Sequence, residues 1–344
     1  MTDVTELITQ HDALLADLDG TLYRGHRAVP AAVEAVTAAA ARGVRTVYIT
    51  NNASRSPADV AAHLADLGYP ATAQDVVTSA QAAAAQLAEQ LEPGTPVLVI
   101  GTDALADEVR KVGLAVTESG DDAAAVVQGH SPDTGWRQLA EAAVALHRGA
   151  GWVACNLDPT LPTERGLLPG NGSMVAALRT ATERDPQVAG KPAPRLIREA
   201  VRRANAHTPL VVGDRLDTDV EGGRAAGLPT LLVLTGVSRP AELLTAPRHR
   251  RPDYLARDLS CLTDSPETLA FGPRPGWVVT RDGDHLVLDG AGDAVDALRA
   301  LCAAHWDTGG GPARIRAVST AARDALAALG LRDDPTHAVS VTVG

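Results

Sequence analysis

The segment Ala16-Asp17-Leu18-Asp19-Gly20-Thr21-Leu22 follows the apolar run Ala13-Leu14-Leu15, and a strand is expected to end at its two aspartates. Residues two positions apart project the same way along an extended segment, so Asp17 and Asp19 face one small site. Two carboxylates at such close range repel each other, and one of them needs a cation or a proton. This pattern is typical of an aspartyl nucleophile with an acid/base partner beside a divalent metal ion.

The bulk composition excludes several classes of protein. The formal net charge is −11 and the pI is about 5.3, whereas binding to nucleic acid or to an anionic membrane needs a basic surface. No secretion signal opens the chain, and no apolar run reaches the roughly 18 residues of a membrane span. We therefore expect a cytoplasmic protein without nucleic-acid or membrane partners, and leave a homodimer open.

Apolar runs alternate with amphipathic stretches along most of the chain, which is typical of parallel α/β sheets. A second α/β series interrupts the first, and the composition shifts again before the C-terminal segment. The sequence thus predicts a core over residues 1–92 and 187–268, an inserted α/β cap over 93–186 and a small α+β unit over 269–344.

The expected elements follow from these patterns. The strands are Leu14–Leu18, Val44–Thr50, Val97–Ile100, Ala124–Val127, Trp152–Asn156, Leu210–Val212, Pro229–Leu234, Trp277–Thr280, His285–Leu288 and His337–Val343. The helices are Ala31–Arg42, Pro57–Leu67, Ala104–Val112, Trp136–Arg148, Ser173–Glu183, Pro194–Asn205, Asp219–Ala226, Asp293–His305 and Val318–Leu329. A strand end and a helix share the stretch from Val76 to about Leu91, and a loop covers Asp158–Asn171.

Three further polar motifs belong to the first α/β series. Thr50-Asn51-Asn52 offers a hydroxyl and backbone N–H groups, Lys191-Pro192 offers a cation, and the segment from Gly213 to Asp219 offers three carboxylates. Ligands of open α/β sheets bind just outside the carboxyl ends of the strands, so these motifs are expected at one crevice. Together with Asp17 they supply a nucleophile, metal ligands, donors and a positive charge, which phosphoryl transfer requires.

In this order, Asp-x-Asp-Gly-Thr, Thr-Asn-Asn, Lys-Pro and Gly-Asp-x4-Asp resemble the motifs of the haloacid dehalogenase (HAD) superfamily of phosphatases. The resemblance implies a Rossmann-like, doubly wound parallel core and an Mg²⁺ cofactor. It makes Asp17 the nucleophile that forms an aspartyl-phosphate, and Asp19 the general acid/base. The other implied roles are phosphoryl binding by Thr50 and Asn51, charge neutralisation by Lys191, and metal binding by Asp17, Asp214, Asp219 and the backbone carbonyl of Asp19.

The long segment between Thr50 and Lys191 resembles the large α/β cap of the type IIA subfamily, which includes glycerol-3-phosphate, phosphoglycolate, pyridoxal-phosphate and nitrophenyl phosphatases. The resemblance implies hydrolysis of a small phosphorylated metabolite, with glycerol 3-phosphate first. Phosphoglycolate or another sugar, nucleotide or aryl phosphate is the alternative. The residues expected to contact the substrate are Gly20, Asn52, Asp158 and Arg165.

The C-terminal segment resembles in architecture the GNAT-like appendage of some bacterial members of the subfamily. It lacks a convincing Arg/Gln-x-x-Gly-x-Gly/Ala loop for the pyrophosphate of acetyl-CoA, so acetyl transfer is not expected. A different class of function stays open, namely a regulator with a weak site that binds a phosphorylated ligand. Asp19 argues against the regulator, because a protein that does not hydrolyse its ligand has no need of this acid.

Overall fold

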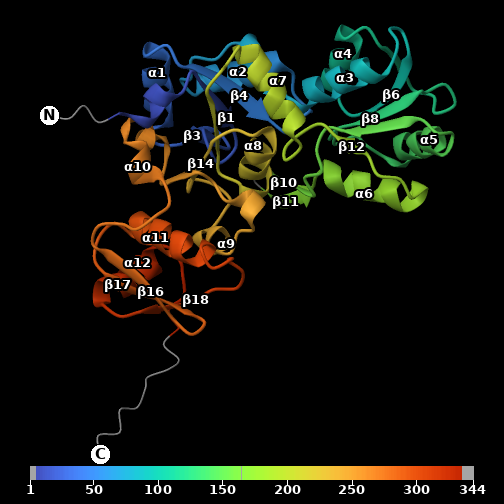
Figure 1. Ribbon diagram of the computed structural model, residues 1–344. Coiled ribbons are helices and arrows are strands. Elements are labelled where there is room, and N and C mark those ends of the chain that lie inside the picture. The colour runs from blue at the N-terminus through green and yellow to red at the C-terminus, as the bar shows by residue number, and fades with distance from the viewer. Residues whose placement is uncertain (1–4, 164, 335–344) are drawn as a thin grey trace, which may run out of the picture.

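A computed structural model of the chain describes residues 5–163 and 165–334, where three larger sheets carry the architecture (Figure 1). The first sheet has six parallel strands in the order β15-β14-β13-β1-β4-β5, which confirms the expected parallel core. Its strands are β1 (Ala13–Asp17), β4 (Arg45–Thr50), β5 (Val76–Thr78), β13 (Pro209–Gly213), β14 (Thr230–Val233) and β15 (Tyr254–Ala256).

Helices cover both faces of this sheet because its central strands are apolar on both sides. Leu14 and Ala16 of β1 pack in one buried cluster with α1 and α2, and Leu15 packs in another with α3 and α7. Burial on both faces leaves the strand ends as the place for polar side chains. These helices are α1 (Ala32–Ala41), α2 (Pro57–Asp66), α3 (Ser79–Gln90) and α7 (Pro194–Ala204).

The register of the first sheet gathers the polar motifs at its carboxyl edge. Asp17 pairs with Ile49 of β4, and Ala16 pairs with Val212 of β13. The residues that follow Ile49 and Val212 therefore leave the sheet beside Asp17. A short hairpin of β2 (Tyr23–Arg24) and β3 (Arg27–Ala28) follows β1 at the same edge.

The chain leaves β13 through a π-helical segment, Leu216–Val220, before α8 (Glu221–Ala226) begins. The helix predicted over Asp219–Ala226 thus ends where expected, but it begins three residues earlier, and its first turn is π-helical. In the wider turn, Asp219 Oδ2 accepts a hydrogen bond from the Arg215 N–H at 3.1 Å. This contact turns the carboxylate back toward the sheet edge.

The second sheet has five parallel strands in the order β12-β9-β8-β6-β7, and it confirms the inserted α/β cap. It lies beside the first sheet, and α4 packs against α3 where the two units meet (Figure 1). Its elements are β6 (Pro96–Ile100), α4 (Asp103–Lys111), β7 (Ala115–Thr117), β8 (Ala125–Gln128), α5 (Trp136–His147), β9 (Gly151–Ala154), α6 (Asn171–Thr182) and β12 (Gln187–Val188). The sequence analysis missed β7, and β12 pairs with β9 beyond residue 186, so the exact domain boundaries stay a prediction.

A β-hairpin occupies most of the segment 158–171, where the sequence analysis expected a loop. Its strands are β10 (Thr160–Thr163) and β11 (Gly166–Pro169), which pair only with each other within the described residues. The side chain of Leu167 is exposed. Because every residue of β11 is exposed, no alternation of buried and exposed side chains marks this strand, and the prolines of the hairpin weaken the strand signal further.

The C-terminal unit is a small mixed sheet with two helices, as the α+β prediction required. Its strands β16 and β17 are antiparallel, and β18, which the sequence analysis missed, pairs with β17 in parallel. Its elements are β16 (Trp277–Asp282), β17 (His285–Gly290), α11 (Ala294–Trp306), β18 (Arg314–Ala317) and α12 (Thr320–Ala328). Two short helices, α9 (Pro240–Leu244) and α10 (Pro266–Leu269), precede this unit in the chain. The strand expected over His337–Val343 lies outside the described residues.

The C-terminal unit shares an apolar core with the first sheet. Leu232 of β14 and Leu255 of β15 belong to the same buried cluster as Leu298 and Leu301 of α11. The unit is therefore packed onto the core rather than tethered to it. Throughout residues 5–163 and 165–334, no helix combines the length and the apolar character that crossing a membrane requires.

Candidate active site

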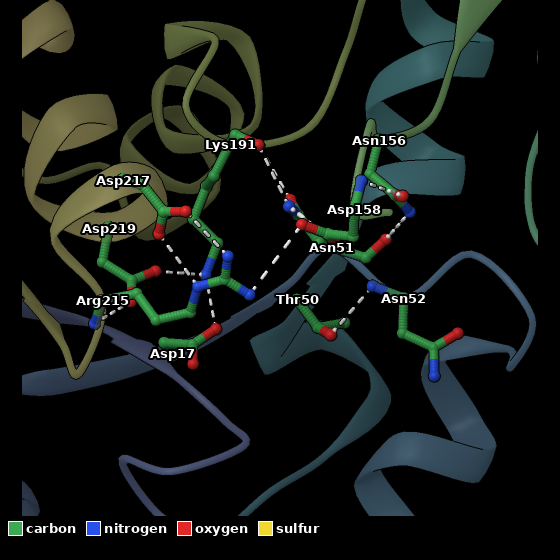
Figure 2. Close-up of polar contacts among 10 residues, drawn as sticks. All are labelled: Asp17, Thr50, Asn51, Asn52, Asn156, Asp158, Lys191, Arg215, Asp217 and Asp219. Atoms are coloured by element: carbon green, nitrogen blue, oxygen red, sulfur yellow. Dashed lines mark hydrogen bonds and ion pairs between the residues drawn. The ribbon is translucent and has the colours of Figure 1, made fainter. Parts of the chain in front are cut away.

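Asp17 ends β1 and points into the crevice at the carboxyl edge of the first sheet (Figure 2). Its side chain is 13% exposed, and Lys191 Nζ donates a hydrogen bond to it. Burial and then the charge of Asp219 raise the pKa of Asp17 well above its usual value, although Lys191 acts in the opposite direction. A carboxylate in such surroundings needs neighbouring positive charge to stay ionised.

Lys191 lies between two carboxylates. Its Nζ bonds to Asp17 and lies 2.7 Å from Asp219 Oδ1, and its side chain is almost fully buried. Burial alone lowers the pKa of Lys191, but the charges of Asp17 and Asp219 outweigh this effect and raise it overall. Lys191 is therefore a fixed cation beside the expected nucleophile, as its position in the sequence predicted.

Asp17, Asp214 and Asp219 together form a candidate metal centre. Each offers one carboxylate oxygen, and the three oxygens lie within 4.8 Å of one another. Burial and the charge of Asp219 raise the pKa of Asp214 to about 6, because Lys191 balances only part of the negative charge. A small divalent cation with a preference for oxygen ligands would balance the rest, so these residues fit Mg²⁺.

Two glycines make room for the Asp214 carboxylate. A Cβ atom on Gly20, whose φ is +86°, would lie 2.5 Å from Asp214 Oδ2, and one on Gly236 would lie 1.8 Å from the same atom. The Val237 N–H donates to this oxygen at 2.6 Å. The main chain thus forms a slot for the carboxylate that side chains would fill. The Gly20 N–H itself donates to the Tyr23 carbonyl at 2.8 Å, and its contact with substrate stays a prediction.

The side chain of Asn51 is engaged inside the protein. Its Oδ1 accepts from the Lys191 N–H at 2.8 Å, and its Nδ2 donates to the Lys191 carbonyl at 3.0 Å and to Asp158 Oδ2 at 3.2 Å. Asn51 therefore fixes the backbone of Lys191. Thr50 Oγ1 accepts from the Asn52 N–H at 3.1 Å. Phosphoryl binding by Thr50 and Asn51 stays a prediction.

Asp158, in the loop after β9, brings the inserted unit into the site (Figure 2). Its carboxylate accepts from Asn51 and lies 4.0 Å from Arg215 Nη1. Burial raises the pKa of Asp158, against the opposing effect of Arg215. Arg215 also donates to both carboxylate oxygens of Asp217, at 3.0 and 2.9 Å. Asn51 and Arg215 of the core thus both lie beside the Asp158 carboxylate of the cap.

Asp19 follows Asp17 by two residues, and it is exposed. Partial desolvation raises the pKa of Asp19, although Arg55 and His63 act in the opposite direction. A raised pKa keeps a proton on the carboxyl group, as a general acid needs.

Two predicted substrate contacts, Arg165 and Asn52, form hydrogen bonds with residues close to them in the chain. Arg165 lies in the turn of the β10–β11 hairpin, where its N–H donates to Thr163 Oγ1 at 3.2 Å. Its side chain is exposed, and within the described residues it forms no hydrogen bond or ion pair with another predicted site residue. Asn52 Oδ1 accepts from the N–H and the hydroxyl of Ser54. Both roles stay predictions.

Two further residues of the site, Arg215 and Asn156, were not predicted from the sequence. Asn156 Nδ2 donates to the Asn51 carbonyl at 2.7 Å, and Arg215 lies between Asp158 and Asp217. Asn156 stands in the long segment between Thr50 and Lys191 that resembles the type IIA cap, and Arg215 stands inside the last motif. Their partners at residues 51 and 158 are far along the chain, so no local pattern shows these contacts.

The fold and the site together define the class: a hydrolase whose carboxylates and lysine lie at the carboxyl edge of a capped parallel sheet. Residues 14–115 match the haloacid dehalogenase-like hydrolases, residues 188–262 match a HAD-hydrolase-like family, and residues 274–331 match the GCN5-related N-acetyltransferase like domain. The chain belongs to the haloacid dehalogenase-like hydrolases, which confirms the resemblance seen in the sequence.

Similar proteins extend this match over almost the whole chain. A D-glycerol 3-phosphate phosphatase of Mycobacterium tuberculosis is 52% identical over 92% of this chain and 93% of its own length. A crystal structure of the glycerol phosphate phosphatase of that organism in complex with magnesium has a TM-score of 0.90 at 51% identity, over 96% of this chain and 100% of that one. A 5'-nucleotidase of Bacillus subtilis is 38% identical over 65% of this chain and 88% of its own length.

Proposed function

We propose that this protein is an Mg²⁺-dependent phosphatase that hydrolyses glycerol 3-phosphate through an aspartyl-phosphate intermediate. The observation that carries the reaction type is the cluster of Asp17, Lys191, Asp214 and Asp219 at the sheet edge. The choice of substrate rests on the similarity to the mycobacterial glycerol phosphate phosphatase, which extends over the core, the cap and the C-terminal unit.

In the first half of the reaction, a carboxylate oxygen of Asp17 attacks the phosphorus atom of the substrate. The new O–P bond replaces the bond between phosphorus and the ester oxygen, and Asp19 gives its proton to the leaving alkoxide. Lys191 stabilises negative charge on Asp17 and on the phosphoryl oxygens. The raised pKa of Asp19 supports its role as the acid.

In the second half, Asp19 is a carboxylate and accepts a proton from a water molecule. The oxygen of this water attacks the phosphorus atom, the bond between phosphorus and Asp17 breaks, and inorganic phosphate leaves. Asp19 ends the cycle protonated and Asp17 ends it ionised, so no further reactant is needed.

Asp17, Asp214, Asp219 and the backbone carbonyl of Asp19 would hold the Mg²⁺ ion. When bound, the ion supplies positive charge to the phosphoryl oxygens and lowers the repulsion between the phosphate and the carboxylates. The two glycines around Asp214 and the hydrogen bond from Val237 hold this ligand in place before any substrate arrives.

The cap supplies the contact with the leaving group. Asp158 is the one carboxylate of the cap that the hydrogen bonds described above bring to the core motifs, and its two acceptor oxygens suit the hydroxyl groups of glycerol. Closure of the cap over the crevice would exclude bulk water and large esters. The cytoplasmic location, the homodimer and the domain boundaries 1–92, 93–186, 187–268 and 269–344 stay predictions.

A metabolite panel tests the proposal. We expect release of phosphate from glycerol 3-phosphate with the highest kcat/KM among glycerol 3-phosphate, 2-phosphoglycolate, sugar phosphates, nucleoside monophosphates and nitrophenyl phosphate. EDTA should abolish the activity and Mg²⁺ should restore it. A higher kcat/KM for another ester would reject the substrate, and no phosphate release from any of them would favour the regulator.

A further inference from the structure

A cavity of about 580 Å³ lies between the core and the C-terminal unit, away from the carboxylate cluster. The core contributes the segment after α9, which includes Thr245, Arg248 and Arg251, and the C-terminal unit contributes Trp306 and Asp307. Because α9 packs directly against α11 (Figure 1), the two walls of the cavity keep a fixed relation to each other.

The cavity holds two guanidinium groups without an acidic partner. Arg250, between them in the sequence, forms an ion pair with Glu221 at 2.7 Å, whereas Arg248 and Arg251 have no carboxylate within ion-pair distance in the described part of the chain. Burial and then the charge of Arg248 lower the pKa of Arg251. Asp307 lines the cavity without pairing with either guanidinium. Such an excess of positive charge is unexpected in a chain with a net charge of −11.

Arg251 is held in place by its neighbours. Its guanidinium carbon lies 5.1 Å from the centroid of the Trp306 ring, and its Nε donates to the Ala246 carbonyl at 3.0 Å. The Trp306 indole N–H donates to the Leu244 carbonyl at 3.0 Å, which fixes the ring. A guanidinium fixed in this way loses little freedom when it binds an anion.

The loop Gly309–Gly311 completes the wall. Its three residues have φ values of +101°, +77° and +101°, which favour glycine. A Cβ atom on Gly310 would lie 2.5 Å from Arg251 Nη2, so the absence of a side chain lets Arg251 lie against the loop. Arg251 Nη2 also donates to the Gly309 carbonyl at 3.3 Å. The glycines thus keep the cavity open beside the guanidinium.

We propose that this cavity is a second anion site, in which Arg248 and Arg251 bind the phosphate group of a small molecule. The geometry of a guanidinium matches two phosphate oxygens, and two guanidiniums balance a dianion. The phosphate has two sources, free inorganic phosphate and a phosphomonoester such as glycerol 3-phosphate. This site is distinct from the carboxylate cluster, and it does not depend on the proposed reaction.

Isothermal titration calorimetry of the full chain at low salt tests the site. EDTA is present throughout to prevent turnover, and sodium phosphate and glycerol 3-phosphate are titrated separately. We expect saturable binding of at least one of them that weakens about tenfold or more in Arg248→Gln, as the loss of a charged hydrogen bond implies. Arg248 is exposed and has no ion-pair partner among the described residues, so this variant should keep its fold.

Arg257→Gln is the matched control, because Arg257 is an exposed arginine of the same junction that pairs with Asp293. It should bind both anions as the unchanged protein does. Tighter binding of phosphate than of the ester identifies free phosphate as the ligand, and the reverse identifies a phosphomonoester. No binding to the unchanged protein, or equal binding by Arg248→Gln, would overturn the proposal, since any remaining signal would then come from elsewhere.

Discussion

The first and second sheets are both parallel and covered by helices, but they present different polar groups to the crevice. The first sheet presents Asp17, Lys191, Asp214 and Asp219, which are crowded, buried and only partly neutralised. The second sheet presents Asp158, together with amide groups that position the core motifs. The uncompensated charge thus lies in the core, whereas the described polar contacts of the cap position residues of the core motifs.

The largest effect is expected at the first sheet, on Asp17. Asp17→Asn removes the nucleophile while it conserves the shape of the side chain, so kcat should fall by on the order of 10⁴ or more. Steady-state phosphate release measures the loss, and circular dichroism checks the fold. The control is Asp66→Asn, at the exposed end of α2. Retention of turnover by Asp17→Asn would contradict the covalent mechanism.

A smaller effect is expected when the metal centre is weakened. Asp214→Asn removes one of three carboxylates, so the Mg²⁺ concentration for half-maximal activity should rise by roughly 10- to 100-fold. A titration of activity with Mg²⁺ measures it. Asp217→Asn serves as the neighbouring control, because Asp217 pairs with Arg215 and lies outside the carboxylate cluster. Equal Mg²⁺ requirements in the two variants would place the metal elsewhere.

The second sheet should show a more selective effect. Asp158→Asn should lower kcat/KM for glycerol 3-phosphate about tenfold, because a charged acceptor becomes neutral, and should change the value for nitrophenyl phosphate by less than about threefold. Asp121→Asn, which breaks an exposed ion pair of the same unit with Arg148, is the control. Equal losses for both esters would show that Asp158 acts on the chemistry and not on recognition.

The buried carboxylate of Asp214 in the first sheet should also make the stability of the fold depend on pH. The pKa of Asp214 rises from its ordinary value of 3.8 to about 6 in the folded protein. At a pH between these two values, the folded state keeps a proton on Asp214 that the unfolded state has lost. Stability in EDTA therefore falls as pH rises through this interval, and the destabilisation is complete above it. Thermal unfolding should show a weaker pH dependence in Asp214→Asn. An unchanged dependence in that variant would remove Asp214 as its source.

The smallest effect is expected in the β10–β11 hairpin. Arg165→Gln should change kcat/KM by no more than about twofold, because the Arg165 side chain is exposed and forms no hydrogen bond or ion pair with another predicted site residue in the described part of the chain. The assay is the one used for Asp158→Asn. A loss of about tenfold or more would support Arg165 as a substrate contact and would require the hairpin to move toward the crevice.

The elements that the sequence predicted well are those with a strong periodic pattern. The strands before Asp17, Thr50 and Asp214 are apolar on both faces, and the order of their polar ends identified the crevice and its Mg²⁺ chemistry. The β10–β11 hairpin escaped prediction because β11 is exposed along its whole length. The contacts of Arg215 and Asn156 escaped because they depend on the meeting of cap and core, and the shared core around Leu232 and Leu298 depends on tertiary packing in the same way.

The most direct test of the account is the identification of the phosphorylated residue. Asp19→Asn should slow hydrolysis of the intermediate, so that it accumulates when the variant meets nitrophenyl phosphate and Mg²⁺, because nitrophenolate leaves without the proton that an alkoxide takes from Asp19. Rapid acid quenching, reduction with borohydride and peptide mass spectrometry then locate the acyl phosphate. The account predicts homoserine in place of Asp17 and an unmodified chain when Asp17 is also replaced. Modification at another carboxylate, or none after a proven turnover, would contradict it.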